Sequence, residues 1–228
     1  MKEKKILSSV ARLHFDRSID GVDIQSKDLR GAIAGLYPDK VLLHQHEKDG
    51  TVRYNYPLVQ YKNIQKECLI VGIERGAKVV YKLDLIGKPI LLSNEIYTIV
   101  KKDHSVRILS FGITEANVSY FFLTPWLALN EENYEKYKNL ESCKEKEELL
   151  KRILIGNIIS VAKGVGYVIP EEIVVSCLKV FPTRTPVKLK GVGMTAFLGE
   201  FTVNFELPDY FGLGKSVSRG FGTIKRIE

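Results

Sequence analysis

The sequence predicts an α+β fold with antiparallel sheets and helices on one face, and three observations support this class. Runs rich in β-branched and aromatic residues alternate with segments whose apolar residues recur at helical spacing. Two of the β-prone runs, 41–46 and 52–62, are joined by a polar loop that contains Asp49-Gly50, which is typical of a hairpin. Residues 223–227 alternate as a short closing strand. Strands connected both by a hairpin and by helices indicate sheets that helices cover on one side.

The first half of the chain follows the order strand, helix, hairpin, strand, helix. We expect a strand over 5–14 and then a helix that Ser26 caps and that Pro38 ends. After the hairpin, the run 68–73 reads as a strand and 75–86 as a second helix. This is the order of a ferredoxin-like β-α-β-β-α-β unit.

The second half reads as a second β-rich unit around one long helix. We expect strands over 90–100, 106–112 and 118–123, and a helix over 133–163 whose opening half is a charged, solvated face. Further strands are expected over 172–181 and 187–206. Trp126 precedes the long helix, and we expect it to be a core residue because large aromatic side chains mostly serve packing.

Composition restricts the class of partner and the compartment. The chain has 228 residues with 34 Lys and Arg against 27 Asp and Glu, a net charge of +7, which favours a polyanionic partner. It contains no apolar run of 18 residues and no apolar segment behind its first lysines, so we expect a cytoplasmic protein without a membrane span. Three widely spaced cysteines indicate reduced thiols and neither a disulfide framework nor a zinc site.

The most distinctive motif is a glycine-rich loop near the end of the chain, residues 212–222. Four of the 18 glycines fall within these eleven residues, in the pattern G-x-G, five residues, G-x-G, with cations and hydroxyls between the two pairs. Such a loop is suited to binding phosphate oxygens. It is neither a P-loop nor a Rossmann turn, because the glycine spacing differs from both. The candidate binding residues are Gly212, Gly214, Lys215, Ser216, Ser218, Arg219, Gly220 and Gly222.

This loop, followed by a final strand, resembles the glycine-rich loop of the CRISPR-associated RAMP proteins. Within that superfamily the chain resembles the endoribonuclease that cuts the CRISPR repeat transcript, and the segment 122–130 is similar to one common in these enzymes. The resemblance implies two ferredoxin-like domains, near 1–100 with the catalytic hairpin and near 101–228 with the RNA-binding loop. It also implies CRISPR repeat RNA, as a single strand or a stem-loop, as the partner, with guide RNA for antiviral defence as the product.

A second constellation lies in the predicted hairpin. His44 and His46 are two residues apart, so on a strand both imidazoles point to one face, where a pair titrating near neutral pH is suited to proton transfer. Tyr54 and Tyr56 follow on the other strand, and Lys40 precedes the pair. The arrangement resembles the members of the endonuclease family with paired histidines and paired tyrosines. We expect His46 to lead catalysis, with His44 and both tyrosines supporting it and Lys40 stabilising charge.

The resemblance implies a metal-independent reaction without a cofactor. A ribose 2′-OH attacks the adjacent phosphorus and leaves a 2′,3′-cyclic phosphate and a 5′-OH. The alternatives are a RAMP subunit that binds RNA without cutting it and an enzyme that acts on a small-molecule phosphate. A further alternative is that the glycine-rich hairpin binds no ligand and the histidines have no catalytic role. Whether the histidine and tyrosine faces coincide depends on hairpin register. Homodimerisation and assembly with other CRISPR-associated proteins stay open.

Overall fold

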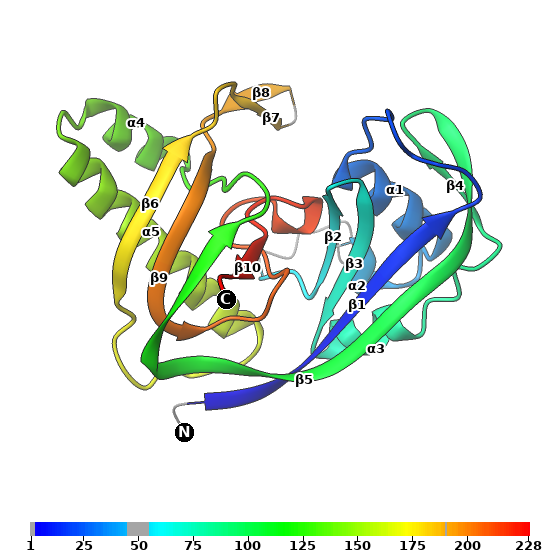
Figure 1. Ribbon diagram of the computed structural model, residues 1–228, viewed down its shortest axis with the longest axis horizontal. Coiled ribbons are helices and arrows are strands. Elements are labelled where there is room, and N and C mark those ends of the chain that lie inside the picture. Colours follow the sequence, from blue (N-terminus) through cyan, green and yellow to red (C-terminus); the bar gives the residue numbers. More distant parts are fainter. Residues whose placement is uncertain (1–2, 45–54, 190) are drawn as a thin grey trace. The chain divides into compact units, whose positions relative to one another are not determined.

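The structure is a computed structural model that describes residues 3–44, 55–189 and 191–228. Its strands and helices are drawn in Figure 1. The chain divides into two compact units, each of which combines antiparallel strands with helices, so the predicted α+β class is confirmed. The N-terminal unit consists of Lys5–Leu109 and Val217–Gly220, and the C-terminal unit consists of Met1–Lys4, Ser110–Ser216 and Phe221–Glu228.

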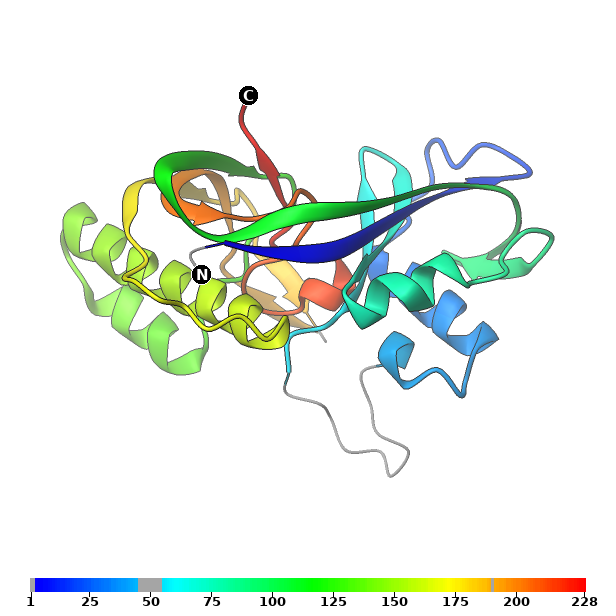
Figure 2. The ribbon, with the colours of Figure 1, turned by 90° about the horizontal axis from the view of Figure 1, so that it is seen from below.

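The N-terminal unit is built on a sheet with the strand order β2-β3-β1-β5, to which β4 adds a short hairpin with β5. Its helices α1, α2 and α3 lie on one side of the sheet, as Figure 2 shows. The elements are β1 (Glu3–Phe15), α1 (Ser26–Leu36), α2 (Val41–His44), β2 (Val59–Ile64), β3 (Glu67–Ile73), α3 (Arg75–Tyr81), β4 (Pro89–Leu92) and β5 (Glu95–Phe122).

The core of this unit fills the space between the sheet and the helices. Leu29 and Ile33 of α1 and Val80 of α3 are fully buried in one cluster with Tyr61 and Ile70 of the sheet. The spacing of Leu29 and Ile33, four residues apart, places both on one face of α1. The helical periodicity of the sequence therefore predicted the buried face correctly.

The start of α1 differs from the prediction by one residue. Gln25 is the N-cap, and the carboxylate of Asp28 accepts a hydrogen bond from the Gln25 backbone N–H at 3.2 Å. Ser26, the predicted cap, is instead the first helical residue. Its hydroxyl accepts a hydrogen bond from the backbone N–H of Asn63 in β2 at 2.9 Å, so it joins the helix to the strand rather than capping the helix.

The strand predicted for 41–46 is wrong over its first four residues, which form the helix α2. The turn after Pro38 starts this helix, because the backbone N–H of Lys40 donates to Tyr37 and that of Leu43 donates to Lys40. Leu43 is fully buried, whereas Leu42 packs only at the border of the core. The partner strand is shorter than expected: among the described residues it begins at Val59, and 55–58 are irregular.

The strand predicted over 90–100 is divided between β4 and the start of β5, and β5 continues as one strand of 28 residues through the two strands predicted over 106–112 and 118–123. It begins at a tight turn in which Ser93 and Asn94 have φ values of 48° and 67°, the conformation that a two-residue hairpin requires. Its register against β9 shifts between Ile113 and Val118. This irregularity bends the strand without ending it, which is what a β-bulge does.

The C-terminal unit is built on the order β5-β9-β6, with β10 paired to β5. The strand predicted over 187–206 is divided into β7 and β8, which pair with each other, and β9. The expected final strand after the glycine-rich loop is present as β10. The elements are α4 (Glu131–Asn139), α5 (Cys143–Gly164), β6 (Val175–Pro182), β7 (Val187–Leu189), β8 (Val192–Met194), β9 (Phe197–Glu206), the 3₁₀ helix η1 (Val217–Arg219) and β10 (Ile224–Arg226).

The long helix predicted for 133–163 is two helices with a break at 140–142. Ser142 caps α5: its hydroxyl accepts the backbone N–H of Glu145 at 3.2 Å, and the carboxylate of Glu145 accepts the backbone N–H of Ser142 at 3.2 Å. This reciprocal pair is a capping box, which satisfies donors that the first turn of a helix leaves open. A new helix therefore begins at this point.

Trp126 is fully buried in the core of the C-terminal unit, as predicted. Its ring stacks on Phe122 with a centroid distance of 5.1 Å and contacts Phe197 at 6.0 Å. The indole N–H donates to the side-chain oxygen of Asn157 at 2.9 Å. The buried ring thus keeps a hydrogen-bond partner for its one polar atom.

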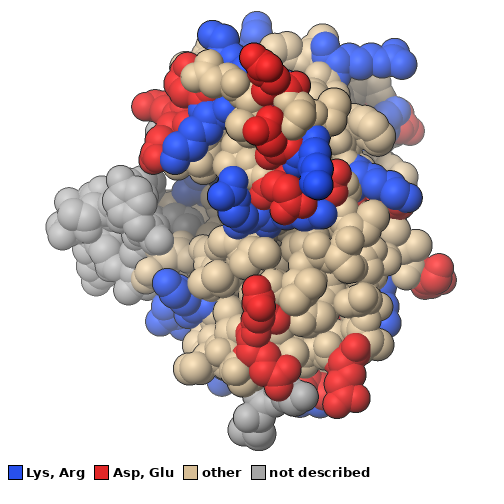
Figure 3. All heavy atoms as spheres, turned by 90° about the vertical axis from the view of Figure 1, so that its left-hand side faces the viewer, with Lys and Arg blue, Asp and Glu red and all other residues tan. Residues whose placement is uncertain are grey.

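Part of the charged face of α4 and α5 is paired within each helix. Lys136 pairs with Glu132, and Lys151 pairs with Glu147 and Glu148. Figure 3 shows cations and anions interspersed on the face of the molecule that carries these helices. The prediction of a solvated helix face is confirmed. None of the helices in the described part of the chain has the length and hydropathy to cross a membrane.

Candidate functional site

The two ends of the glycine-rich loop, 212–216 and 221–222, belong to the C-terminal unit. Several N–H groups of the loop donate to carbonyl oxygens of the C-terminal unit: Lys215 to Leu127 at 3.0 Å, and Gly222 to Pro125 at 2.9 Å. Gly214 has a φ of 91°, and a Cβ at this position would lie 2.8 Å from the ring of Trp126. The N–H groups of Lys215 and Gly222 are therefore used within the protein and are not available to a ligand.

The polar side chains of the loop remain available for a ligand. Lys215 is exposed, and Ser216, Ser218 and Arg219 are half-buried. Within the described residues, the side chains of Lys215, Ser216 and Ser218 form no hydrogen bond or ion pair. Two hydroxyls and two cations can thus contact an anion, which is the chemistry that phosphate recognition uses.

The middle of the loop, residues 217–220, belongs to the N-terminal unit. Here η1 packs against α1 and β2. Gly220 has a φ of 90°, and a Cβ at this position would lie 2.2 Å from the hydroxyl oxygen of Ser26 in α1. Only a glycine allows this approach of loop to helix. Arg219 is thereby placed beside α1.

A buried lysine lies beneath η1. Lys62 of β2 is fully buried, and its amine donates to the carbonyl oxygen of Val217 at 3.3 Å. Burial lowers the pKa of this amine to about 7, because an apolar environment disfavours the charged form. The sequence analysis did not single out Lys62. The sequence carries little signal for it, because the strand 59–64 also carries the polar residues Gln60 and Asn63, and its burial comes from packing in the fold.

His44 is the last residue of α2, so the predicted strand geometry, with two imidazoles on one strand face, does not hold for it. Its Nε2–H donates to the carbonyl oxygen of Tyr37 at 3.1 Å. This hydrogen bond leaves Nδ1 of the neutral ring as the acceptor. The carbonyl oxygen of His44 itself accepts a hydrogen bond from the guanidinium of Arg30.

The other predicted catalytic residues divide into described and undescribed ones. Lys40 is half-buried, with its amine 5.7 Å from the centroid of the Tyr37 ring. Tyr56 is half-buried in the irregular segment that leads into β2. His46 and Tyr54 lie outside the described residues. The structure therefore brings Lys40 and His44 to one turn, and the predicted grouping with His46 and the tyrosines stays a prediction.

Arg30 is the second residue that the sequence analysis missed, because it lies outside the apolar face of α1. Its guanidinium is half-buried, and burial together with the nearby positive charge of Arg219 lowers its pKa. The hydroxyl of Tyr61 donates to the carbonyl oxygen of Leu43 at 3.4 Å. Tyr61 and Arg30 together satisfy carbonyl groups at the end of α2, which a helix C-terminus leaves open.

Comparison with known proteins identifies the family. The family model for the Cas6b N-terminal domain matches residues 8–110, and that for the Cas6b C-terminal domain matches residues 112–227. A Methanocaldococcus jannaschii protein named "Uncharacterized protein MJ0978" is 42% identical over 137 residues, which are 60% of this chain and 91% of that protein.

Two solved structures extend the similarity over the whole fold. The crystal structure of a Cas6b matches with a TM-score of 0.84 and 36% identity, covering 97% of this chain and 100% of that one. The crystal structure of a CRISPR RNA processing endoribonuclease Cas6b matches with a TM-score of 0.74 and 35% identity, with the same coverage. The two-domain RAMP fold that the glycine-rich loop implied is confirmed. The chain belongs to the Cas6b family.

Proposed function

We propose that this protein is an endoribonuclease that cuts CRISPR repeat RNA in the precursor transcript. The observation that carries the proposal is the match to Cas6b over both parts of the chain, including 35% identity to a CRISPR RNA processing endoribonuclease. The glycine-rich loop adds local support, because its exposed lysine, half-buried arginine and two hydroxyls suit an RNA backbone. The loop residues from Gly212 to Gly222 named above are proposed to bind the repeat.

The proposed reaction needs only proton transfers. A base removes the proton of a ribose 2′-OH, the 2′-oxygen forms a bond to the adjacent phosphorus, and the bond from phosphorus to the 5′-oxygen breaks. An acid protonates the departing 5′-oxygen. The products are a 2′,3′-cyclic phosphate and a 5′-OH. Because each step moves a proton or exchanges a P–O bond, imidazole and phenol groups suffice and no metal ion or cofactor is required.

The roles follow from the chemistry of each side chain. His46 is proposed to transfer a proton at the reaction centre. His44 supports it through Nδ1, since Nε2 is engaged with Tyr37. Tyr54 and Tyr56 orient the nucleophile or share in proton transfer, and the amine of Lys40 offsets the charge that grows on the phosphoryl oxygens. The N-terminal unit thus supplies the proposed cutting residues.

A cleavage assay in EDTA tests this proposal. The substrates are the repeat RNA of the neighbouring CRISPR locus and a copy with one 2′-deoxyribose at the cleavage position. The expected result is cleavage of the first alone, with a 2′,3′-cyclic phosphate on the upstream product. Cleavage of both RNAs, or a dependence on added metal ion, would contradict the mechanism.

One observation favours a second candidate, a RAMP subunit that binds RNA without cutting it. His44 forms two hydrogen bonds within the protein: its Nε2–H donates to the carbonyl oxygen of Tyr37, and its own carbonyl oxygen accepts from the guanidinium of Arg30. Tight binding of the repeat RNA without any cleavage would establish this candidate. In that case the double variant His44→Ala, His46→Ala would bind RNA as the wild type does.

A further inference from the structure

We propose that Arg30 of α1 and Arg219 of η1 form one binding site for a single phosphate of the RNA backbone. The inference deepens the proposed function and rests on RNA being the substrate. It adds Arg30 to the binding surface, and it ties this phosphate to the end of α2, which leads directly to the proposed catalytic histidine.

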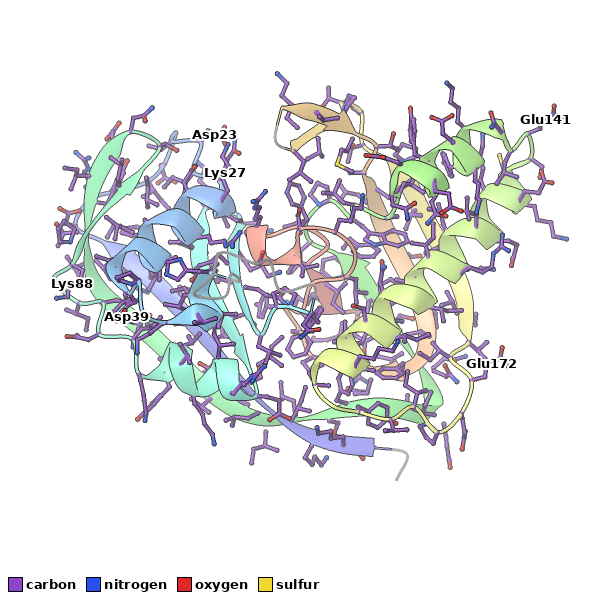
Figure 4. All side chains as sticks on the ribbon, turned by 180° about the vertical axis from the view of Figure 1, so that it is seen from behind. Asp23, Lys27, Asp39, Lys88, Glu141 and Glu172 are labelled. Carbon is purple, nitrogen blue, oxygen red and sulfur yellow. The ribbon has the colours of Figure 1, made fainter. Side chains whose placement is uncertain are left out.

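The two side chains are brought together by the fold and not by the sequence. Ser26 and Arg30 are four residues apart and so lie on the same face of α1. Gly220 seats the loop against Ser26, and Arg219 is the residue just before it. Figure 4 views the molecule from behind, with α1 running from the labelled Lys27 toward the labelled Asp39, and η1 packs on this helix. Arg219 therefore reaches the same side of α1 as Arg30.

The two cations have no acidic partner among the described residues. Neither guanidinium forms an ion pair with a described carboxylate, and Asp28, the one carboxylate of α1, caps its own helix by accepting the Gln25 N–H. The positive charge of Arg219 acts on half-buried Arg30, which lowers the pKa of Arg30 in addition to burial. Two cations held close together cost free energy in the folded protein, and a bound anion offsets that cost.

A phosphodiester fits this site better than a carboxylate or a small anion. Guanidinium groups present planar pairs of N–H donors that match phosphate oxygens. Two such groups can each take one of the two non-bridging oxygens of a backbone phosphate. The fully buried amine of Lys62 also lies beneath η1, where it donates to the carbonyl oxygen of Val217.

Arg30 also connects the site to the proposed catalytic segment. Its guanidinium donates to the carbonyl oxygen of His44, the last residue of α2. His46 follows two residues later. A phosphate held by Arg30 is therefore fixed relative to the chain that enters the proposed catalytic segment. Arg30 is thus a binding residue that also positions α2.

The test is a double-mutant cycle in RNA binding. The variants are Arg30→Gln, Arg219→Gln and the double variant, with Arg30→Lys to retain the charge and Lys88→Gln as a control. Lys88 is an exposed cation of the same unit, at the end of α1 away from Lys27 (Figure 4). Affinity for a labelled repeat RNA with a 2′-deoxyribose at the cleavage position is measured by fluorescence anisotropy. Thermal unfolding of each variant verifies the fold.

We expect each single Gln variant to weaken binding about tenfold, which is the effect of losing a charge-assisted hydrogen bond. The double variant should be weaker than either single variant by less than about threefold, because both side chains serve one phosphate. The control should change affinity little. In a second experiment, each backbone phosphate of the RNA is replaced in turn by a neutral methylphosphonate. At one position this replacement should lower the affinity of the wild type, and at that position it should not lower the affinity of Arg219→Gln any further.

The proposal would be overturned if the affinity loss of the double variant equalled the product of the two single losses. It would also be overturned if no methylphosphonate position gave a loss that Arg219→Gln abolishes. Arg30 would then serve only as a cap for α2. Because the readout is binding, it separates this inference from the proposed reaction. If the two arginines are coupled in binding but the protein does not cleave RNA, the phosphate site stands and the proposed endoribonuclease activity is rejected. If the protein cleaves RNA but the arginines are not coupled, the activity stands and the phosphate site is rejected.

Discussion

Replacing Lys62 by methionine should remove a pH-dependent part of the stability. Lys62 is fully buried on β2 and burial lowers its pKa from 10.5 to about 7. Methionine has a similar length and no charge. In the unfolded chain the amine keeps its proton up to about pH 10.5, whereas in the folded protein it loses the proton near pH 7. Between these values the unfolded state binds more protons, so the free energy of unfolding rises with pH.

The size of the effect follows from the two pKa values. Each pKa unit corresponds to about 1.4 kcal/mol. Between pH 7 and pH 9 the unfolded chain stays protonated while the folded protein passes from half-protonated to neutral. The wild type should therefore gain about 2 kcal/mol from this group over that interval. Lys62→Met should lack this gain. The variant also loses the hydrogen bond to Val217, which changes its free energy of unfolding at every pH. The informative quantity is therefore how the difference in free energy of unfolding between wild type and variant changes with pH.

Urea unfolding followed by circular dichroism, at pH 7 and pH 9 and equal ionic strength, measures this difference. Lys82→Met is the control, because Lys82 is exposed and its charge is solvated in both states. We expect the wild-type minus Lys62→Met difference to rise by about 2 kcal/mol between the two pH values, and the control difference to stay constant. An unchanged difference for Lys62→Met would refute the reasoning, since it would mean that Lys62 keeps the same protonation on folding.

Three further predictions concern the loop, a helix cap and catalysis. Gly220→Ala should cost about 1–3 kcal/mol of stability, because its φ is 90° and its Cβ would meet the Ser26 hydroxyl at 2.2 Å; urea unfolding measures this, and an unchanged midpoint would contradict the loop geometry. Ser142→Ala should cost about 1 kcal/mol, because the first turn of α5 loses its cap; Ser142→Asp, which retains an acceptor, should restore most of it. His46→Ala should slow repeat-RNA cleavage by about 100-fold or more at unchanged RNA affinity; single-turnover kinetics measures this, and a wild-type rate would remove His46 from the mechanism.

The elements that the sequence predicted well are those with a strong local pattern. The spacing of Leu29 and Ile33 indicated α1 and its buried face, because an amphipathic period of 3.6 residues is visible in one sequence. The break before α5 was not predicted, although Ser142 and Glu145 have the spacing of a capping box, because a continuous run of charged residues surrounds it. α2 was misread because four residues do not cover two periods, so Val41-Leu42-Leu43 fits a strand and a helix equally well.

The site was predicted only where its residues are adjacent in the chain. The glycine-rich loop is one segment, so its polar and basic side chains are visible in the sequence, and their binding of RNA stays a prediction. The use of its N–H groups depends on partners such as Leu127, which lies 88 positions before Lys215 in the chain, and no local pattern records such a partner. The sequence therefore located the loop but could not show which of its N–H groups are already bonded within the protein.

Arg30 and Lys62 were missed for the same reason, because their partners lie far away in the chain. Each is unremarkable in its own segment: Arg30 lies outside the apolar face of α1, and Lys62 lies in a strand that also carries Gln60 and Asn63. Their significance comes from η1, which is separated from Lys62 by 155 residues at Val217. A buried cation costs free energy wherever it has no compensating partner. In the folded protein the carbonyl oxygen of Val217 accepts a hydrogen bond from the Lys62 amine, and no pattern in the residues around Lys62 indicates this distant acceptor.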